Sequence, residues 1–162
     1  MRLTTRSNLA MRVLMFCAVN SDRIVRKHEI AVVCNASENH LAQVVNTLAQ
    51  TGFIQTHRGR SGGLELARAP EKIGVGDVLR TFEGMLPFAE CFDAKTNTCP
   101  LSEACLLREA LIEALEAFYG ALDRKTLADL VTDNAALEAI LHLDRGESMR
   151  ICSTRNTLAA TR

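Results

Sequence analysis

Hydrophobic residues recur at helical spacing through the first fifty residues and predict three helices. Residues 8–19 are apolar at almost every position except Arg12, which is typical of a helix that neighbouring elements cover on most sides. A shorter helix is predicted over residues 26–34, followed by a tight turn in which Ser37 caps the next helix. From residue 38 to residue 50 the apolar side chains stand at i, i+3, i+4 and i+7 and form one stripe: Leu41, Val44, Val45 and Leu48.

A change from helical to alternating periodicity after Gly52 predicts a β-hairpin. Residues 53–57 and 64–66 alternate between apolar and polar side chains, and glycines and arginines occupy the tip at 58–63. Glycines permit positive φ and close approach of the backbone to a ligand, and arginines beside them can bind a phosphate or enter a minor groove. A nucleotide-binding phosphate loop is disfavoured, because the tip lacks Gly-Lys-Ser/Thr and no helix follows its glycines directly.

The order of helix, helix-turn-helix and basic hairpin is that of a winged helix-turn-helix module. The polar face of residues 38–50 carries side chains that both donate and accept hydrogen bonds, as reading of base edges in a major groove requires. Such a face alone is more often an ordinary solvated surface, but the hairpin that follows it favours DNA binding. The predicted DNA-binding residues are Ser37, Asn39, His40, Gln43, Asn46, Arg58, Gly59, Arg60, Ser61 and Gly62.

A long helix is predicted in the second half of the chain, from Cys105 to about Leu122, after a short helix over residues 75–83. Its apolar side chains recur at alternating spacings of three and four, the pattern of a heptad seam: Ala104, Leu107, Leu111, Ala114, Phe118 and Ala121. The seam could pack within one chain, but a two-fold dimer is favoured because winged helices usually bind paired half-sites. Short helices are predicted over residues 126–131 and 134–143.

Charge is distributed unevenly along a chain whose formal net charge is zero. Residues 1–69 carry a net charge of +5, residues 70–143 one of −7 and residues 144–162 one of +2. A basic half is what a protein that approaches a polyanion needs. The sequence contains no run of eighteen apolar residues, so no membrane-spanning helix is predicted. Arg12 interrupts the apolar stretch near the start that resembles a secretory signal, so a cytoplasmic protein with no membrane partner is expected.

Three of the six cysteines, Cys91, Cys99 and Cys105, are separated by seven and five residues. This spacing suits a loop around an iron–sulfur cluster better than a zinc knuckle, which favours pairs two to four residues apart. Zinc binding, or three unliganded thiols, remain alternatives from spacing alone. Cys17 and Cys34 fall within apolar helical stretches and are expected to be buried in the core without a ligand role. Cys152 is expected to be an exposed, unliganded thiol of the tail.

Seven segments together resemble one family of regulators: residues 38–41 (ENHL), 44–45 (VV), 48–53 (LAQTGF), 56–63 (THRGRSGG), 89–92 (AECF), 97–99 (NTC) and 127–131 (LADLV). They resemble the winged-helix iron–sulfur repressors that include NsrR, RirA and IscR, and are most similar to the nitric-oxide-sensitive branch. The resemblance covers residues 1 to about 143. It implies a homodimeric repressor of a palindromic operator whose [4Fe–4S] or [2Fe–2S] cluster reacts with nitric oxide, releasing genes for nitric oxide detoxification or nitrogen-oxide metabolism.

Two positions depart from the patterns that the resemblance carries. IscR-like members place a histidine three residues after the last cysteine, where this chain has Arg108, which argues against the IscR branch. In NsrR relatives an aspartate near the start of the first helix can complete the cluster from the partner subunit, and the matching position here is Asn8. A neutral amide is a poorer iron ligand than a carboxylate, so the fourth ligand stays open. A RirA-like, iron-responsive repressor is the alternative function.

The predicted fold class is mainly α with a small β-hairpin, a winged helix-turn-helix domain plus a long dimerisation helix. The DNA-binding domain is expected over residues 1–70, the cluster-binding loop and dimerisation helices over 71–143, and a disordered tail over 144–162. An electron-transfer or cluster-carrier protein would have no use for the basic wing, and a zinc-stabilised regulator would lack redox sensing. No enzyme is predicted, because no nucleophile is paired with a base and the four histidines show no ligand or relay spacing.

Overall fold

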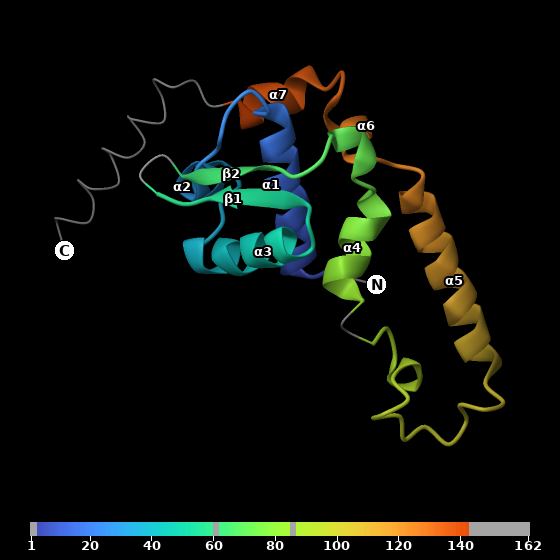
Figure 1. The fold of residues 1–162 in the computed structure, drawn as a ribbon. Helices are drawn as coiled ribbons and strands as arrows, with labels where there is room; N and C mark the ends of the chain where they lie inside the picture. Colours follow the sequence, from blue (N-terminus) through green and yellow to red (C-terminus); the bar gives the residue numbers. More distant parts are fainter. Residues whose placement is uncertain (1–2, 60–61, 85–86, 143–162) are drawn as a thin grey trace.

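The first three helices of the protein pack as a helix-turn-helix unit (Figure 1). The structure, a computed structural model, describes residues 3–59, 62–84 and 87–142. Helices α1 (Thr5–Val19), α2 (Lys27–Val33) and α3 (Glu38–Gln50) follow the predicted order, and α3 has the predicted bounds. Helix α1 begins before the expected residue 8 because Thr4 caps it: its Oγ1 accepts a hydrogen bond from the Ser7 amide at 3.2 Å.

The predicted hairpin is confirmed as strands β1 (Ile54–His57) and β2 (Gly63–Leu66), which pair antiparallel with His57 opposite Gly63. It is fastened to the segment before α2 by two backbone hydrogen bonds between Val25 and Leu64, of 2.9 and 2.7 Å. A side chain at Gly63 would collide with the Val25 carbonyl, so only glycine allows this approach. The tip residues Arg60 and Ser61 lie outside the described residues.

One hydrophobic core joins the first and the last described helices. Side chains of α1 and the apolar stripe of α3 meet there, with Phe16 and Leu48 fully buried. Helices α6 (Leu127–Val131) and α7 (Ala135–Leu141) return to the same core, and the Asn20 amide donates to the Leu141 carbonyl at 3.1 Å. The predicted division of the chain at residue 70 stays a prediction, and the predicted tail lies outside the described residues.

Helices α4 (Val75–Glu83) and α5 (Leu106–Asp123) lie side by side, to one side of the helix-turn-helix unit, and the cysteine segment joins them at one end (Figure 1). Arg80 of α4 binds Asp123 of α5 through two hydrogen bonds of 2.6 Å each. Two 3-10 turns, η1 (Pro70–Lys72) and η2 (Glu90–Phe92), flank α4 along the chain. The predicted fold class is confirmed: mainly α, with a winged helix-turn-helix and one long helix. Within the described residues no helix is both long and apolar enough to cross a membrane.

Candidate nucleic-acid interface and cysteine loop

Helix α3 exposes the polar face that the sequence predicts for base reading. Asn39, His40, Gln43 and Asn46 are exposed, while the apolar stripe of the same helix is buried. Ser37 caps the helix, because its Oγ accepts a hydrogen bond from the His40 amide at 3.3 Å. The four exposed side chains therefore stand on a helix whose orientation is set by its buried face and by its cap.

A concave surface joins α3 to the hairpin. Asn46 lines it from α3, and Arg58, Gly59 and Gly62 line it from the wing. Gly59 has φ of 104°, in the region that favours glycine. The structure thus brings four of the predicted DNA-binding residues to one surface, and their role in binding DNA stays a prediction.

Lys27 lines the same concave surface and was not among the predicted residues. It is exposed and is the first residue of α2. The amino end of a helix carries a partial positive charge, so a lysine there is placed against the local electrostatic preference. A lysine at the first position of a predicted helix was the signal in the sequence that could have marked this residue as a candidate.

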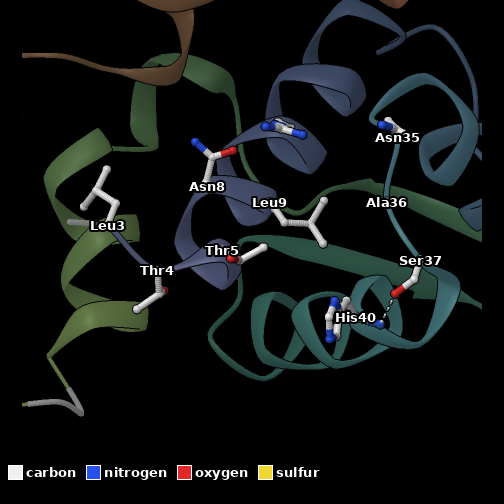
Figure 2. Close-up of a pocket in the computed structure, with 10 residues that line it drawn as sticks. Leu3, Thr4, Thr5, Asn8, Leu9, Asn35, Ala36, Ser37 and His40 are labelled. Atoms are coloured by element: carbon white, nitrogen blue, oxygen red, sulfur yellow. Dashed lines mark hydrogen bonds between the residues drawn. The ribbon is translucent and has the colours of Figure 1, made fainter.

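A second pocket lies between the start of α1 and the turn before α3 (Figure 2). Asn8 and Arg12 line it from α1, and Ser37 and His40 line it from the other side. Arg12 is held there because its Nη1 donates to the Cys34 carbonyl at the end of α2, at 3.0 Å. The position that the resemblance connects with the cluster therefore shares a pocket with two predicted DNA-binding residues.

The three clustered cysteines lie along the segment between α4 and α5. Cys91 lies in η2, Cys105 immediately precedes α5, and Cys99 lies between them; all three are half-buried and free of disulfides. The Glu90 carboxylate accepts hydrogen bonds from the Thr98 amide and hydroxyl, at 2.8 and 2.6 Å. These bonds lower the pKa of Glu90 below its usual value, so the carboxylate stays charged while it holds the loop.

Arg108 ties the start of this loop to the first turn of α5. Its Nε donates to the Cys91 carbonyl at 3.2 Å, and its guanidinium lies 5.9 Å from the centre of the Phe92 ring. Cys105 stands at the amino end of α5, where the helix dipole favours negative charge. The amino end of α5 thus places a partial positive charge beside Cys105, and Arg108 lies against the backbone of Cys91.

The donor set of the loop suits an iron–sulfur group in its chemistry, since three free thiols lie on one loop whose ends are tied together. Over residues 3–59, 62–84 and 87–142, however, no three His, Cys, Asp or Glu side chains are gathered closely enough to hold a metal ion. Binding therefore requires the loop to draw its thiols together. Asn8 as a fourth ligand stays a prediction.

The other two described cysteines are buried, as predicted. Cys17 and Cys34 are 2% and 5% exposed. Burial, together with the nearby Cys34, raises the pKa of Cys17 to about 12, and burial also raises that of Cys34. The Cys17 thiol therefore stays protonated at neutral pH, which suits a core side chain and not a metal ligand.

Comparison with known proteins places the chain among regulators. A family model described as Rrf2, an iron-dependent transcriptional regulator, matches residues 3–133. The chain belongs to the Rrf2 family. It is therefore related to transcriptional regulators and not to enzymes, as the sequence predicts.

Named relatives and solved structures agree with this family. The chain is 44% identical to the HTH-type transcriptional regulator NsrR of Geobacillus kaustophilus over 147 residues, which are 90% of this chain and all of the relative. It is 41% identical to the HTH-type transcriptional repressor NsrR of Streptomyces coelicolor, over 81% of this chain and 88% of the relative. Its fold resembles that of CymR, the global cysteine regulator of B. subtilis, with a TM-score of 0.64 and 26% identity over 82% of this chain and 97% of CymR. The predicted resemblance to NsrR is confirmed.

Proposed function

We propose that this Rrf2 protein is a homodimeric repressor in which an iron–sulfur cluster on Cys91, Cys99 and Cys105 sets the affinity for a palindromic operator. Nitric oxide is the signal that lowers this affinity and releases genes for nitric oxide detoxification or nitrogen-oxide metabolism. The proposal rests mainly on the position of the three-cysteine loop, which joins α4 to the long helix α5. Helix α4 is in turn hydrogen-bonded to the cap of α1, because Glu83 accepts from the Thr4 amide. The loop can thus act on DNA binding and on subunit contact together.

DNA is bound by α3 and the wing. The exposed amides of Asn39, Gln43 and Asn46 offer donors and acceptors to base edges in a major groove. Lys27 and Arg58, on the concave surface beside them, bind backbone phosphates. The net charge of +5 over residues 1–69 supplies the long-range attraction.

A second copy of the chain covers α5. No residue of this 18-residue helix is buried within the described chain, and Leu107 of the predicted seam is 67% exposed. Burying a leucine side chain contributes about 1.5–3 kcal/mol, so a seam of apolar residues favours association strongly. A two-fold axis along α5 presents two copies of α3 to the two halves of a palindrome.

The cysteine loop holds the cluster when it closes. An iron–sulfur cluster with three thiolate ligands leaves an iron position at which a small diatomic such as nitric oxide can bind. Cys105 contributes its thiolate at the positive end of α5, and Arg108 keeps Cys91 at the same end of the helix. The Asn8 amide is a weaker ligand than a carboxylate, which favours an exchangeable fourth position.

An iron-responsive repressor of the RirA type is the second candidate. The description of the family model as an iron-dependent regulator favours it, and the same three cysteines serve it. The two candidates differ in their signal. Removal of iron releases DNA in both, whereas release by nitric oxide with iron still in excess occurs only in the first.

Two cysteine variants test the proposal against a zinc-stabilised or unliganded loop. The unsubstituted protein and Cys17→Ala, purified without oxygen, are expected to absorb visible light and to release a palindromic duplex in a mobility-shift assay when nitric oxide is added. Cys99→Ser is expected to lose both the absorbance and the response. A colourless unsubstituted protein, or DNA retained after complete reaction with nitric oxide, would overturn the proposal.

A further inference from the structure

Glu83, the last residue of α4, reaches across to the start of α1. Its Oε1 accepts a hydrogen bond from the Thr4 amide at 2.7 Å and another from the Ser7 hydroxyl. Ser7 is fully buried, and its hydroxyl also lies 2.6 Å from that of Thr4. Burial opposes the charge on Glu83, but the bonds from Ser7 and Thr4 outweigh it and hold its pKa below the usual value. A charged carboxylate therefore completes the cap of α1.

The segment that Glu83 holds is a wall shared by two pockets. Leu3 and Thr4 line the pocket that Asn8, Ser37 and His40 line beside α3 (Figure 2). The same two residues also line a different pocket, between α4, α5 and the start of the cysteine segment, whose lining includes Phe88, Phe92 and Tyr119. A shift of this wall therefore changes both pockets.

Helix α4 connects this wall to the cysteine loop and to α5. Arg80, one turn before Glu83, binds Asp123 through two hydrogen bonds of 2.6 Å, and its guanidinium lies 4.6 Å from the centre of the Tyr119 ring. The cysteine-bearing segment follows α4 directly in the chain. A movement of the cysteine loop or of α5 would therefore be transmitted to Glu83 through α4.

We propose that Glu83 is a positioning residue that couples the state of the cysteine loop to DNA binding, by holding residues 3–7 against the pocket beside α3. This inference rests on the proposed function, because it needs a loop state that alters DNA affinity. Glu83 touches neither DNA nor a thiol in this account. Its removal uncouples the two sites while leaving each of them able to bind.

The test measures the ratio of operator dissociation constants without and with the cluster, using full-length protein made anaerobically and a chelator-treated portion of the same sample. Couplings between sites are typically about 5–150-fold, and the unsubstituted protein is expected in that range. Glu83→Ala is expected to bring the ratio to within about twofold of one. Glu83→Gln keeps an acceptor oxygen and is expected to restore part of the ratio. Glu71→Ala, an exposed glutamate on η1, is the matched control and keeps the full ratio.

Ser7→Ala provides a second variant that leaves the Glu83 charge in place, should Glu83→Ala fail to fold. It removes one of the two bonds and is expected to lower the ratio part of the way. A helix cap with no coupling role would lower Tm and weaken both states by the same factor, leaving the ratio unchanged. If Glu83→Ala keeps the ratio of the unsubstituted protein, or if Ser7→Ala does so when Glu83→Ala does not fold, this inference alone is overturned. A ratio of one in the unsubstituted protein would overturn the proposed function and the inference with it.

Discussion

Lys27→Ala and Arg58→Ala each remove one exposed cation from the concave surface beside α3. If each side chain binds one phosphate, its loss reduces the slope of log K against log salt by about 0.9 per subunit, or about 1.8 for a dimer. Between 50 and 200 mM salt, unsubstituted protein is then expected to lose about 12-fold more affinity than either variant. The double variant is expected to lower the slope by about 3.6.

Fluorescence anisotropy with a palindromic duplex and an unrelated duplex, at several salt concentrations, measures these slopes. A phosphate contact carries no sequence information, so both duplexes should respond alike. Lys72→Ala, on the exposed η1 turn, is the matched control and should leave the slope unchanged. An unchanged slope in Lys27→Ala, or an equal change in Lys72→Ala, would refute the assignment of Lys27 to the DNA surface.

Three further predictions concern α5, the Glu83 cap and the cysteine loop. Leu107→Glu should convert a dimer to a monomer in sedimentation experiments with little loss of helicity, because Leu107 is 67% exposed within one chain; a persistent dimer would contradict the seam. The lowered pKa of Glu83 implies a contribution to stability that is full above its unfolded pKa, near 4.5, and is lost as the pH falls through the lower folded pKa. Glu83→Gln should remove this pH dependence of Tm. An unchanged profile of Tm against pH would contradict the contribution. Arg108→Ala should release iron to a chelator faster than Arg108→Lys, which keeps the charge; equal rates in the two variants and the unsubstituted protein would argue against the tie to Cys91.

Local patterns predicted the helices and strands well, because the periodicity and the capping residues of each element lie within its own stretch of chain. The stripe of α3 and its Ser37 cap lie within one stretch of chain, and the predicted bounds agree with the structure. The start of α1 was placed too late, although Thr4 is a capping residue by type, since apolar periodicity alone begins later.

Contacts between distant segments could not be predicted in the same way. The bonds from Thr4 and Ser7 to Glu83 join residues 79 and 76 positions apart, and Arg80 and Asp123 are 43 apart. Nothing in a helical period encodes such pairs, because they arise only when two helices pack. Cysteine spacing likewise identified the candidate ligands, but how far the thiols stand from one another depends on the path of the loop.

If the proposed function holds, one reaction at the cysteine loop controls DNA binding. An anaerobic titration with nitric oxide, in which visible absorbance and the anisotropy of a bound palindromic duplex are recorded in the same cuvette, tests it most directly. The DNA is expected to be released over the same additions of nitric oxide that change the absorbance, with iron in excess throughout. A complete change in absorbance with the duplex still bound would contradict it.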